Sequence, residues 1–194
     1  MGNRERILEF SLAAFNRQGF DQVSTLTITS ELAISPGNLY YHFANRDEIA
    51  RALMQECELA LQRLSQQFEQ EVVSGEDYWP YLHSLLTLLD QYRFVLRDLA
   101  GPALGHSAIR RPLTKLLSQL RQLGQRALQR LQELGWLQLE QTQRELLAEN
   151  ILMVTIGWLQ LHSLAHPEPL PPATIRAGVK QLLALVQPYL TASG

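Results

Sequence analysis

The sequence predicts an all-α protein in which a small head of three short helices precedes a larger domain of long helices. Three observations predict this architecture. Apolar residues recur at steps of three and four in most segments, residues that start and stop helices separate these segments, and we find no alternating apolar and polar run bounded by hairpin turns. We place the two domains at residues 1–45 and 46–194.

The head is expected to contain three helices of unequal length. An apolar stripe over residues 7–15 predicts the first, which ends at Gly19 because glycine commonly terminates helices. Thr25 is a suitable N-cap for the second helix, and residues 33–35 form the turn that follows it. Pro36 suits the first position of the third helix, where its missing N–H leaves no hydrogen bond unmade.

Longer helices are expected in the second domain. Asn45 can cap a fourth helix that extends to about residue 73 and joins the two domains. Asp77 can cap the next helix, which Gly101 and Pro102 end. That helix is predicted at residues 79–99, and three more helices are predicted at residues 112–134, 141–166 and 172–190.

Size and composition limit the class of protein. The 194 residues are 46% hydrophobic and 19% charged, which is ordinary for a globular protein with a core. The net charge of −2 means that any nucleic-acid function must depend on local geometry. Cys57 is the only cysteine, so no internal disulfide can form. We find no signal peptide, and the apolar run 151–161 is about half the length that crosses a bilayer, so we expect a cytoplasmic protein without membrane contact.

The strongest functional signal is the nonapeptide Ser35-Pro36-Gly37-Asn38-Leu39-Tyr40-Tyr41-His42-Phe43. Small and aromatic polar side chains on a short helix after a tight turn suit the major groove of DNA, with Leu39 and Phe43 as apolar anchors. No acidic residue lies between Glu31 and Asp47, so this surface is free of carboxylates from its own segment. The alternative is that Tyr40 and Tyr41 pack a small core.

Together with residues 7–15, 19–20, 25–32 and 46–49, this segment resembles the TetR family of bacterial repressors over about the first 50 residues. The resemblance implies a helix-turn-helix head that binds a double-stranded DNA operator. The positions that it implies for DNA contact are Thr25, Ser35, Pro36, Gly37, Asn38, Tyr40, Tyr41, His42 and Arg46. Ala33 departs from the glycine usual in the turn, which costs about 1 kcal/mol if the backbone there needs a positive φ.

The last two helices predict a homodimer. The stretch 151–161 is almost continuously apolar, so its helix must be buried on more than one side. A four-helix bundle between two chains provides this burial, and a purely intramolecular core is the alternative. The expected interface residues are Trp158, Leu161, Ile175, Val179, Leu182 and Val186.

An aromatic-rich middle segment predicts a cavity for an effector. The resemblance implies a mostly apolar pocket whose small apolar or amphipathic ligand spreads the two heads, with the fourth helix as lever. The expected ligand-binding residues are Trp79, His83, Tyr92, Phe94, Leu117, Arg121 and Met153. Ordinary core packing is the alternative. The basic stretch 109–132 either forms a solvated face or attracts an anionic effector.

These observations predict a ligand-responsive DNA-binding transcriptional regulator, most simply a repressor that binds a palindromic operator as a dimer. The alternative is a helical small-molecule-binding or scaffold protein without specific operator binding. No nucleophile–base–acid set or cofactor motif stands out, so we expect no enzyme activity, no cofactor and no metal. We expect Tyr41→Ala and Arg46→Ala each to weaken operator binding with little loss of helicity.

Overall fold

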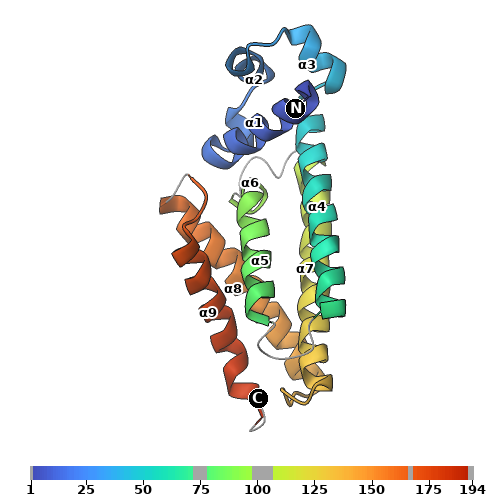
Figure 1. The fold of residues 1–194 in the computed structure, drawn as a ribbon, viewed down its shortest axis with the longest axis vertical. Helices are drawn as coiled ribbons and strands as arrows, with labels where there is room; N and C mark the ends of the chain where they lie inside the picture. Colours follow the sequence, from blue (N-terminus) through green and yellow to red (C-terminus); the bar gives the residue numbers. More distant parts are fainter. Residues whose placement is uncertain (1, 72–77, 98–106, 166–167, 192–194) are drawn as a thin grey trace.

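The computed structural model describes residues 2–71, 78–97, 107–165 and 168–191, and these residues confirm the all-α fold. Within these ranges the only β pairing is an isolated antiparallel bridge between Leu137 and Leu190. Figure 1 shows an elongated molecule with the three-helix head at one end and a bundle of longer helices below it. The N-terminus lies in the head, and the C-terminus lies at the opposite end of the bundle.

The head consists of α1 (Asn3–Gln18), a 3-10 turn η1 (Phe20–Gln22), α2 (Thr25–Leu32) and α3 (Pro36–His42). Gly19 ends α1 with a φ of 93°, and Pro36 is the first residue of α3, both as predicted. The cap of α2 differs from the prediction, because Ser24 rather than Thr25 precedes the helix. Its Oγ accepts the Thr27 N–H at 3.0 Å.

The body consists of α4 (Arg46–Glu71), α5 (Tyr78–Gln91), α6 (Phe94–Arg97), α7 (Ser107–Glu133), α8 (Gln141–Ala165), α9 (Pro172–Val186) and η4 (Gln187–Tyr189). Asn45 caps α4 as predicted, since its Oδ1 accepts the Glu48 N–H at 3.0 Å. The cap predicted at Asp77 lies outside the described residues. The α7 helix begins before Pro112, which lies inside it.

The single helix predicted at residues 79–99 is divided into α5 and α6. A side chain of the head satisfies backbone groups at the break: Asn16 Nδ2 donates to the Gln91 carbonyl at 2.8 Å, and Asn16 Oδ1 accepts the Phe94 N–H at 2.9 Å. Long-range hydrogen bonding to Asn16 therefore outweighs the local helix propensity at this point. The sequence of residues 79–99 alone could not reveal this break.

The core runs continuously from the head to the far end of the body. In the body α4 packs on α7, α7 on α8 and α8 on α9, while α5 contacts α4, α8 and α9. Gly178 allows α9 to approach its neighbours closely, because a Cβ there would lie 2.7 Å from Trp158 Nε1 and 3.0 Å from Leu86 Cδ1. This packing buries Ile175, Val179 and Leu182 inside the protomer.

Ala33 adopts the left-handed conformation, with φ 51° and ψ 43°, in the turn between α2 and α3. The Cβ of an L-residue is strained in this region, whereas glycine is not. We therefore expect Ala33→Gly to raise the free energy of unfolding by about 0.5 kcal/mol, the gain being reduced by the larger entropy of glycine in the unfolded chain. Urea denaturation followed by circular dichroism measures it.

The matched control is Ala13→Gly, at an exposed position inside α1. There the same chemical change removes a good helix former, so it should lower the free energy of unfolding by about 1 kcal/mol. Loss of stability in both variants would contradict the assignment of strain to Ala33.

Candidate nucleic-acid interface and ligand cavity

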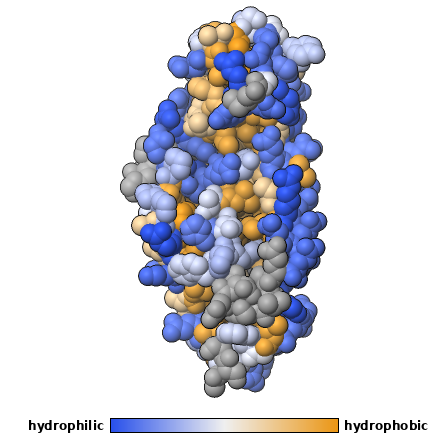
Figure 2. All heavy atoms as spheres, viewed as in Figure 1, coloured by the Kyte–Doolittle hydropathy of each residue, from blue (hydrophilic) through white to orange (hydrophobic). Residues whose placement is uncertain are grey.

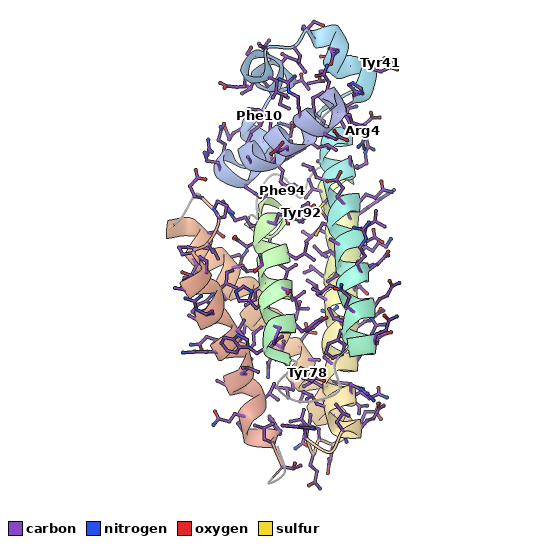
Figure 3. The ribbon with its side chains drawn as sticks, viewed as in Figure 1. Arg4, Phe10, Tyr41, Tyr78, Tyr92 and Phe94 are labelled. Atoms are coloured by element: carbon purple, nitrogen blue, oxygen red, sulfur yellow. The ribbon has the colours of Figure 1, made fainter. Side chains whose placement is uncertain are left out.

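The α3 helix presents its polar aromatic side chains to solvent. Tyr41 is 84% exposed and Tyr40 is 55% exposed, whereas Leu39 and Phe43 are buried in the head. Figure 3 shows Tyr41 pointing outward at the head end of the molecule. The alternative that the two tyrosines pack a core is therefore wrong, and the assignment of Leu39 and Phe43 as anchors is confirmed.

The start of α3 is held in place by hydrogen bonds within the head. Ser35 Oγ caps the helix by accepting the Asn38 N–H at 3.2 Å, and Asn38 Oδ1 accepts a hydrogen bond from Asn3 Nδ2 at 3.1 Å. Pro36 and Gly37 are exposed beside them, and His42, half-buried, lies edge-on to the Tyr41 ring. These interactions fix the orientation of α3 relative to α1 before any ligand is bound.

A shallow hollow of about 290 Å³ brings together residues from the starts of α2 and α4 and from α3. Three predicted residues, Thr25, Tyr40 and Arg46, line it, together with Ser24, Ala44 and Asn45, which the sequence analysis did not select. Helix N-termini direct backbone N–H groups and a partial positive charge outward, so two of them beside hydroxyl groups suit an anion such as a phosphate. The capping role of Ser24 and Asn45 was the signal that could have identified them.

Arg46 is also a structural residue of the head. Its guanidinium lies over the Phe20 ring at 4.1 Å and donates to the carbonyls of Asp21 and Val23 at 3.0 and 3.2 Å. The side chain is only 22% exposed. The substitution Arg46→Ala, expected to weaken operator binding with little loss of helicity, therefore removes contacts within the head as well as a positive charge.

The head also exposes apolar side chains. Figure 2 shows apolar side chains on the head where α2 lies. Leu26 of α2 is 70% exposed and was not selected from the sequence. An apolar side chain next to a groove-reading helix can contact a thymine methyl group.

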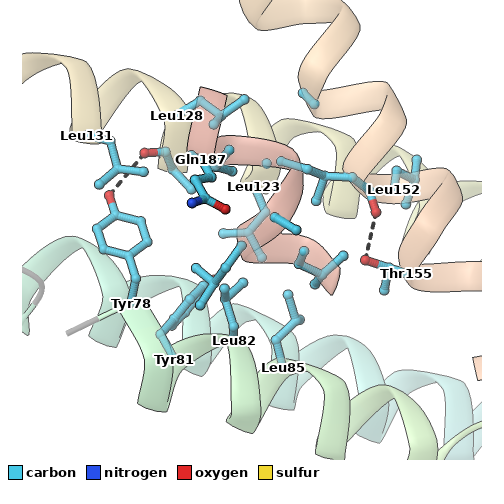
Figure 4. A pocket seen from close by; sticks show the side chains of 18 of the residues that line it. Tyr78, Tyr81, Leu82, Leu85, Leu123, Leu128, Leu131, Leu152, Thr155 and Gln187 are labelled. Carbon is cyan, nitrogen blue, oxygen red and sulfur yellow. Dashed lines mark hydrogen bonds between the residues drawn. The ribbon is translucent and has the colours of Figure 1, made fainter. Parts of the chain in front are cut away.

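The body contains a cavity of about 720 Å³ that opens to solvent and is lined by residues from the part of the bundle distant from the head. Figure 4 shows its lining side chains from close by. Side chains of α5, α7, α8, α9 and η4 form most of its wall, in which leucine is the most frequent residue. Two polar groups in the wall already have partners: Tyr78 Oη donates to the Ala127 carbonyl at 3.0 Å, and Thr155 Oγ1 donates to the Ile151 carbonyl at 2.7 Å. The arrangement suits a predominantly apolar small molecule.

The prediction of ligand-binding residues does not match this cavity. None of Trp79, His83, Tyr92, Phe94, Leu117, Arg121 and Met153 is in its wall. The α5 helix does contribute to the wall, but through Tyr78, Tyr81, Leu82 and Leu85. Trp79 and His83 each follow a lining residue by one position, and periodicity alone does not say which face of an apolar helix borders a void.

The structure places those seven residues elsewhere for identifiable reasons. Tyr92 and Phe94 are buried near the head, where the Phe94 ring contacts Phe15 at 5.5 Å. Arg121 pairs with Glu149 at 2.6 Å, and Met153 is exposed on α8. Trp79 and Leu117 are half-buried against the core. His83 lines a separate cavity of about 480 Å³ between head and body.

The predicted dimer residues are divided between interior and surface. Ile175, Val179 and Leu182 are core residues of the protomer, so these three are corrected to intramolecular contacts. Trp158 is half-buried: its ring stacks on His162 and borders Gly178, and its contact with a partner stays a prediction. Val186 is half-buried in the cavity wall. Leu161 is 68% exposed and remains available for a partner.

The basic character of α7 is largely neutralised by carboxylates. Four of its cations form ion pairs, and three of these reach neighbouring helices: Lys115 with Glu58, Arg121 with Glu149, Arg126 with Glu69 and Arg130 with Glu133. These pairs favour a solvated, ion-paired face over an anion site. In the described ranges, no helix has the length and apolar character needed to cross a membrane.

A helix-turn-helix head with an exposed third helix, carried on a helical body with an apolar cavity, defines a one-component DNA-binding regulator class. Comparison with known families specifies the class further. Residues 7–53 match the family described as "Bacterial regulatory proteins, tetR family", and residues 50–194 match "Bacterial transcriptional repressor" of the TetR type. The chain belongs to the TetR family.

Individual relatives agree with this assignment. The HTH-type transcriptional regulator UidR of Escherichia coli is 37% identical over 97 residues, which cover 50% of this chain and 47% of UidR. The match thus spans about half the length of this curated relative. A crystal structure of a TetR-family transcriptional regulator from Marinobacter aquaeolei is 31% identical, with a TM-score of 0.87, over 100% of this chain and 93% of that one.

A more distant structure shares the fold. A transcriptional regulator from Saccharomonospora viridis, in complex with choline, is 19% identical with a TM-score of 0.75, over 97% of each chain.

Proposed function

We propose that this chain is a ligand-responsive transcriptional repressor that binds a palindromic DNA operator as a homodimer and is released by a small-molecule effector. The observation that carries the proposal is the exposed α3 surface. Tyr40 and Tyr41 project from a helix whose apolar residues are buried and whose start is fixed by Ser35 and Asn38. Large exposed aromatics on a rigid element are costly to solubility unless they serve recognition.

The hollow formed by Ser24, Thr25, Tyr40 and Arg46 supports a second part of the proposal. We assign it to a phosphate of the DNA backbone, with hydroxyl groups and helix N-termini as donors. Contacts to phosphate set the position of the head, whereas α3 reads the bases. We keep the assignment of four further α3 residues to the surface that contacts the bases: Pro36, Gly37, Asn38 and His42.

An apolar stripe on α8 supports dimerisation. Leu146, Met153 and Leu161 are all more than half exposed, and their spacing of seven and eight residues keeps them on one side of the helix. Exposed apolar side chains in such a row mark a protein interface. We therefore assign the contact with the partner chain to this face of α8. Leu161 was already predicted as an interface residue from the sequence, whereas Met153 was predicted as a ligand-binding residue and is reassigned here.

Contacts along α4 and at the head–body junction can couple the cavity to the head. Near the C-terminal end of α4, Phe68 contacts the rings of Tyr78 and Tyr81, both in the cavity wall, at 5.4 and 4.4 Å. Near its N-terminal end, α4 buries Ile49 and Leu53 at the head. A ligand that fits only one orientation of these helices shifts the population of head positions by its differential affinity.

Asn16 forms a second connection between the head and the body, because its side chain hydrogen-bonds backbone groups at the break between α5 and α6. We expect Asn16→Ala to lower the free energy of unfolding by about 2 kcal/mol, since it leaves the buried Phe94 N–H without an acceptor. Thermal or urea denaturation measures this loss. Gln18→Ala, at an exposed position of the same helix, should change stability by less than about 0.5 kcal/mol. Equal effects of the two substitutions would contradict a stabilising role for the Asn16 hydrogen bonds, which we call the Asn16 clamp.

The experiment that separates the proposal from its alternative is a competition titration. The protein is first bound to a labelled duplex that contains a selected inverted repeat. Unlabelled non-specific DNA is then added in increasing excess, and the titration is repeated at several salt concentrations. An operator-binding protein retains the specific duplex against a large excess of competitor, with an affinity that falls steeply with salt. A helical ligand-binding or scaffold protein without operator binding loses both duplexes equally.

A further inference from the structure

The wall of the 720 Å³ cavity has an uneven distribution of charge. Twenty-two described residues line it, and Lys180 is the only one with a charged side chain. Neither Asp nor Glu is among these described lining residues. A charged ligand group in an apolar site is stable only when a group of opposite charge is within reach. The wall therefore offers a side chain of opposite charge to an anionic group, and its described residues offer no carboxylate to a cationic one.

Lys180 is placed to act on a ligand at the cavity edge. It is an exposed residue of α9, and its ammonium forms no ion pair with the part of the chain that the structure describes. The α9 sequence contains no acidic residue, and Arg176 adds a second positive charge one turn before Lys180. The local potential at this edge is thus positive.

The tyrosines of the wall add no opposing charge. Burial raises the pKa of the Tyr78 and Tyr81 hydroxyls well above the ordinary value, so both stay neutral at physiological pH. Apolar side chains of α5, α7, α8 and α9 form most of the rest of the wall. The cavity is therefore an apolar chamber with a single unpaired cation at its edge.

We propose that the cavity takes a hydrophobic monocarboxylic acid whose carboxylate lies at Lys180 and whose hydrocarbon part lies among the leucines of α5, α7 and α8. This inference rests on the proposed function, in which the cavity holds the effector, and it specifies the class of that effector. It also separates this chain from the Saccharomonospora viridis regulator, whose ligand, choline, is a cation.

Three ten-carbon probes that differ only in the head group test the proposal. Decanoate, decan-1-ol and decylammonium are titrated below their micelle concentrations, with tryptophan emission as readout because Trp136 lines the cavity. We expect decanoate to bind about five-fold more tightly than decanol, as suits one partly solvated ion pair, and decylammonium to bind most weakly. Decanol binding as tightly as decanoate, or no binding of any probe, overturns the proposal.

Variants of α9 assign the preference to one residue. Lys180→Gln should remove the five-fold advantage of decanoate and leave decanol binding unchanged, whereas Arg176→Gln, outside the cavity wall, should preserve it. Both positions are exposed, so both variants should fold. A decanoate advantage that survives Lys180→Gln overturns the proposal.

A parallel titration of the selected duplex distinguishes this inference from the proposed function. Specific DNA binding without decanoate preference refutes the ligand class alone. Decanoate preference without specific DNA binding refutes the operator-binding function and leaves the ligand class standing.

Discussion

We expect Tyr41→Ala to reduce operator affinity about 100-fold and to leave the fold unchanged. In the proposed dimer, each of the two heads would lose a large exposed side chain that we assign to DNA contact, so a cost of about 1.4 kcal/mol per head gives this factor. The side chain is 84% exposed, and the one ring contact that the structure gives it is with the neighbouring His42. Stability should therefore change by less than about 0.5 kcal/mol. Fluorescence anisotropy with a labelled operator measures the affinity, and circular dichroism the fold.

Two further variants test which part of the side chain acts. Tyr41→Phe keeps the ring and removes only the hydroxyl, so it should lie between the native protein and Tyr41→Ala. Leu59→Ala removes an exposed apolar side chain from α4, away from α3, and should leave operator affinity unchanged. Native affinity in Tyr41→Ala would mean that α3 does not enter the groove.

We expect Leu161→Glu combined with Met153→Glu to convert the proposed dimer to a monomer and to abolish specific operator binding. The substitutions place four carboxylates in one symmetric apolar interface, where burial of unpaired charge is costly. Sedimentation at micromolar concentration should give a mass of 22.1 kDa for the variant and twice that for the native protein. Operator affinity should fall on the order of 1,000-fold, toward the non-specific value, because each half-site then binds separately.

The control for this prediction is Leu59→Glu, which adds a carboxylate at an exposed leucine outside the proposed interface. This variant should remain dimeric and bind the operator. A native protein that sediments as one chain would remove the dimer from the account, whatever the behaviour of the variants.

The head could be predicted from the sequence because its signals are local. Glycine at the end of α1, the turn at Ala33 and proline at the start of α3 each act through backbone geometry within a few residues. The nonapeptide around Tyr41 also contains both the anchors and the exposed residues of α3. The structural role of Arg46 was missed because Phe20 and Asp21, its partners, are about 25 positions away.

The body was predictable in outline and not in detail. Most helix positions followed from apolar periodicity, but this pattern did not reveal which part of an apolar face meets the cavity. Trp79 was chosen where Tyr78 lines the wall. Val179 was assigned to a partner although it fills the protomer's own core. The Asn16 clamp, which divides α5 from α6, joins positions about 75 residues apart.

Selection of bound duplexes from a random-sequence pool tests the central claim most directly. If two copies of α3 enter successive major grooves, the enriched sequences should be inverted repeats whose half-site centres lie about 34–36 Å apart, one turn of B-DNA. The enrichment should disappear with Tyr41→Ala. An unenriched pool, or a single half-site without symmetry, would contradict a dimeric operator-binding repressor.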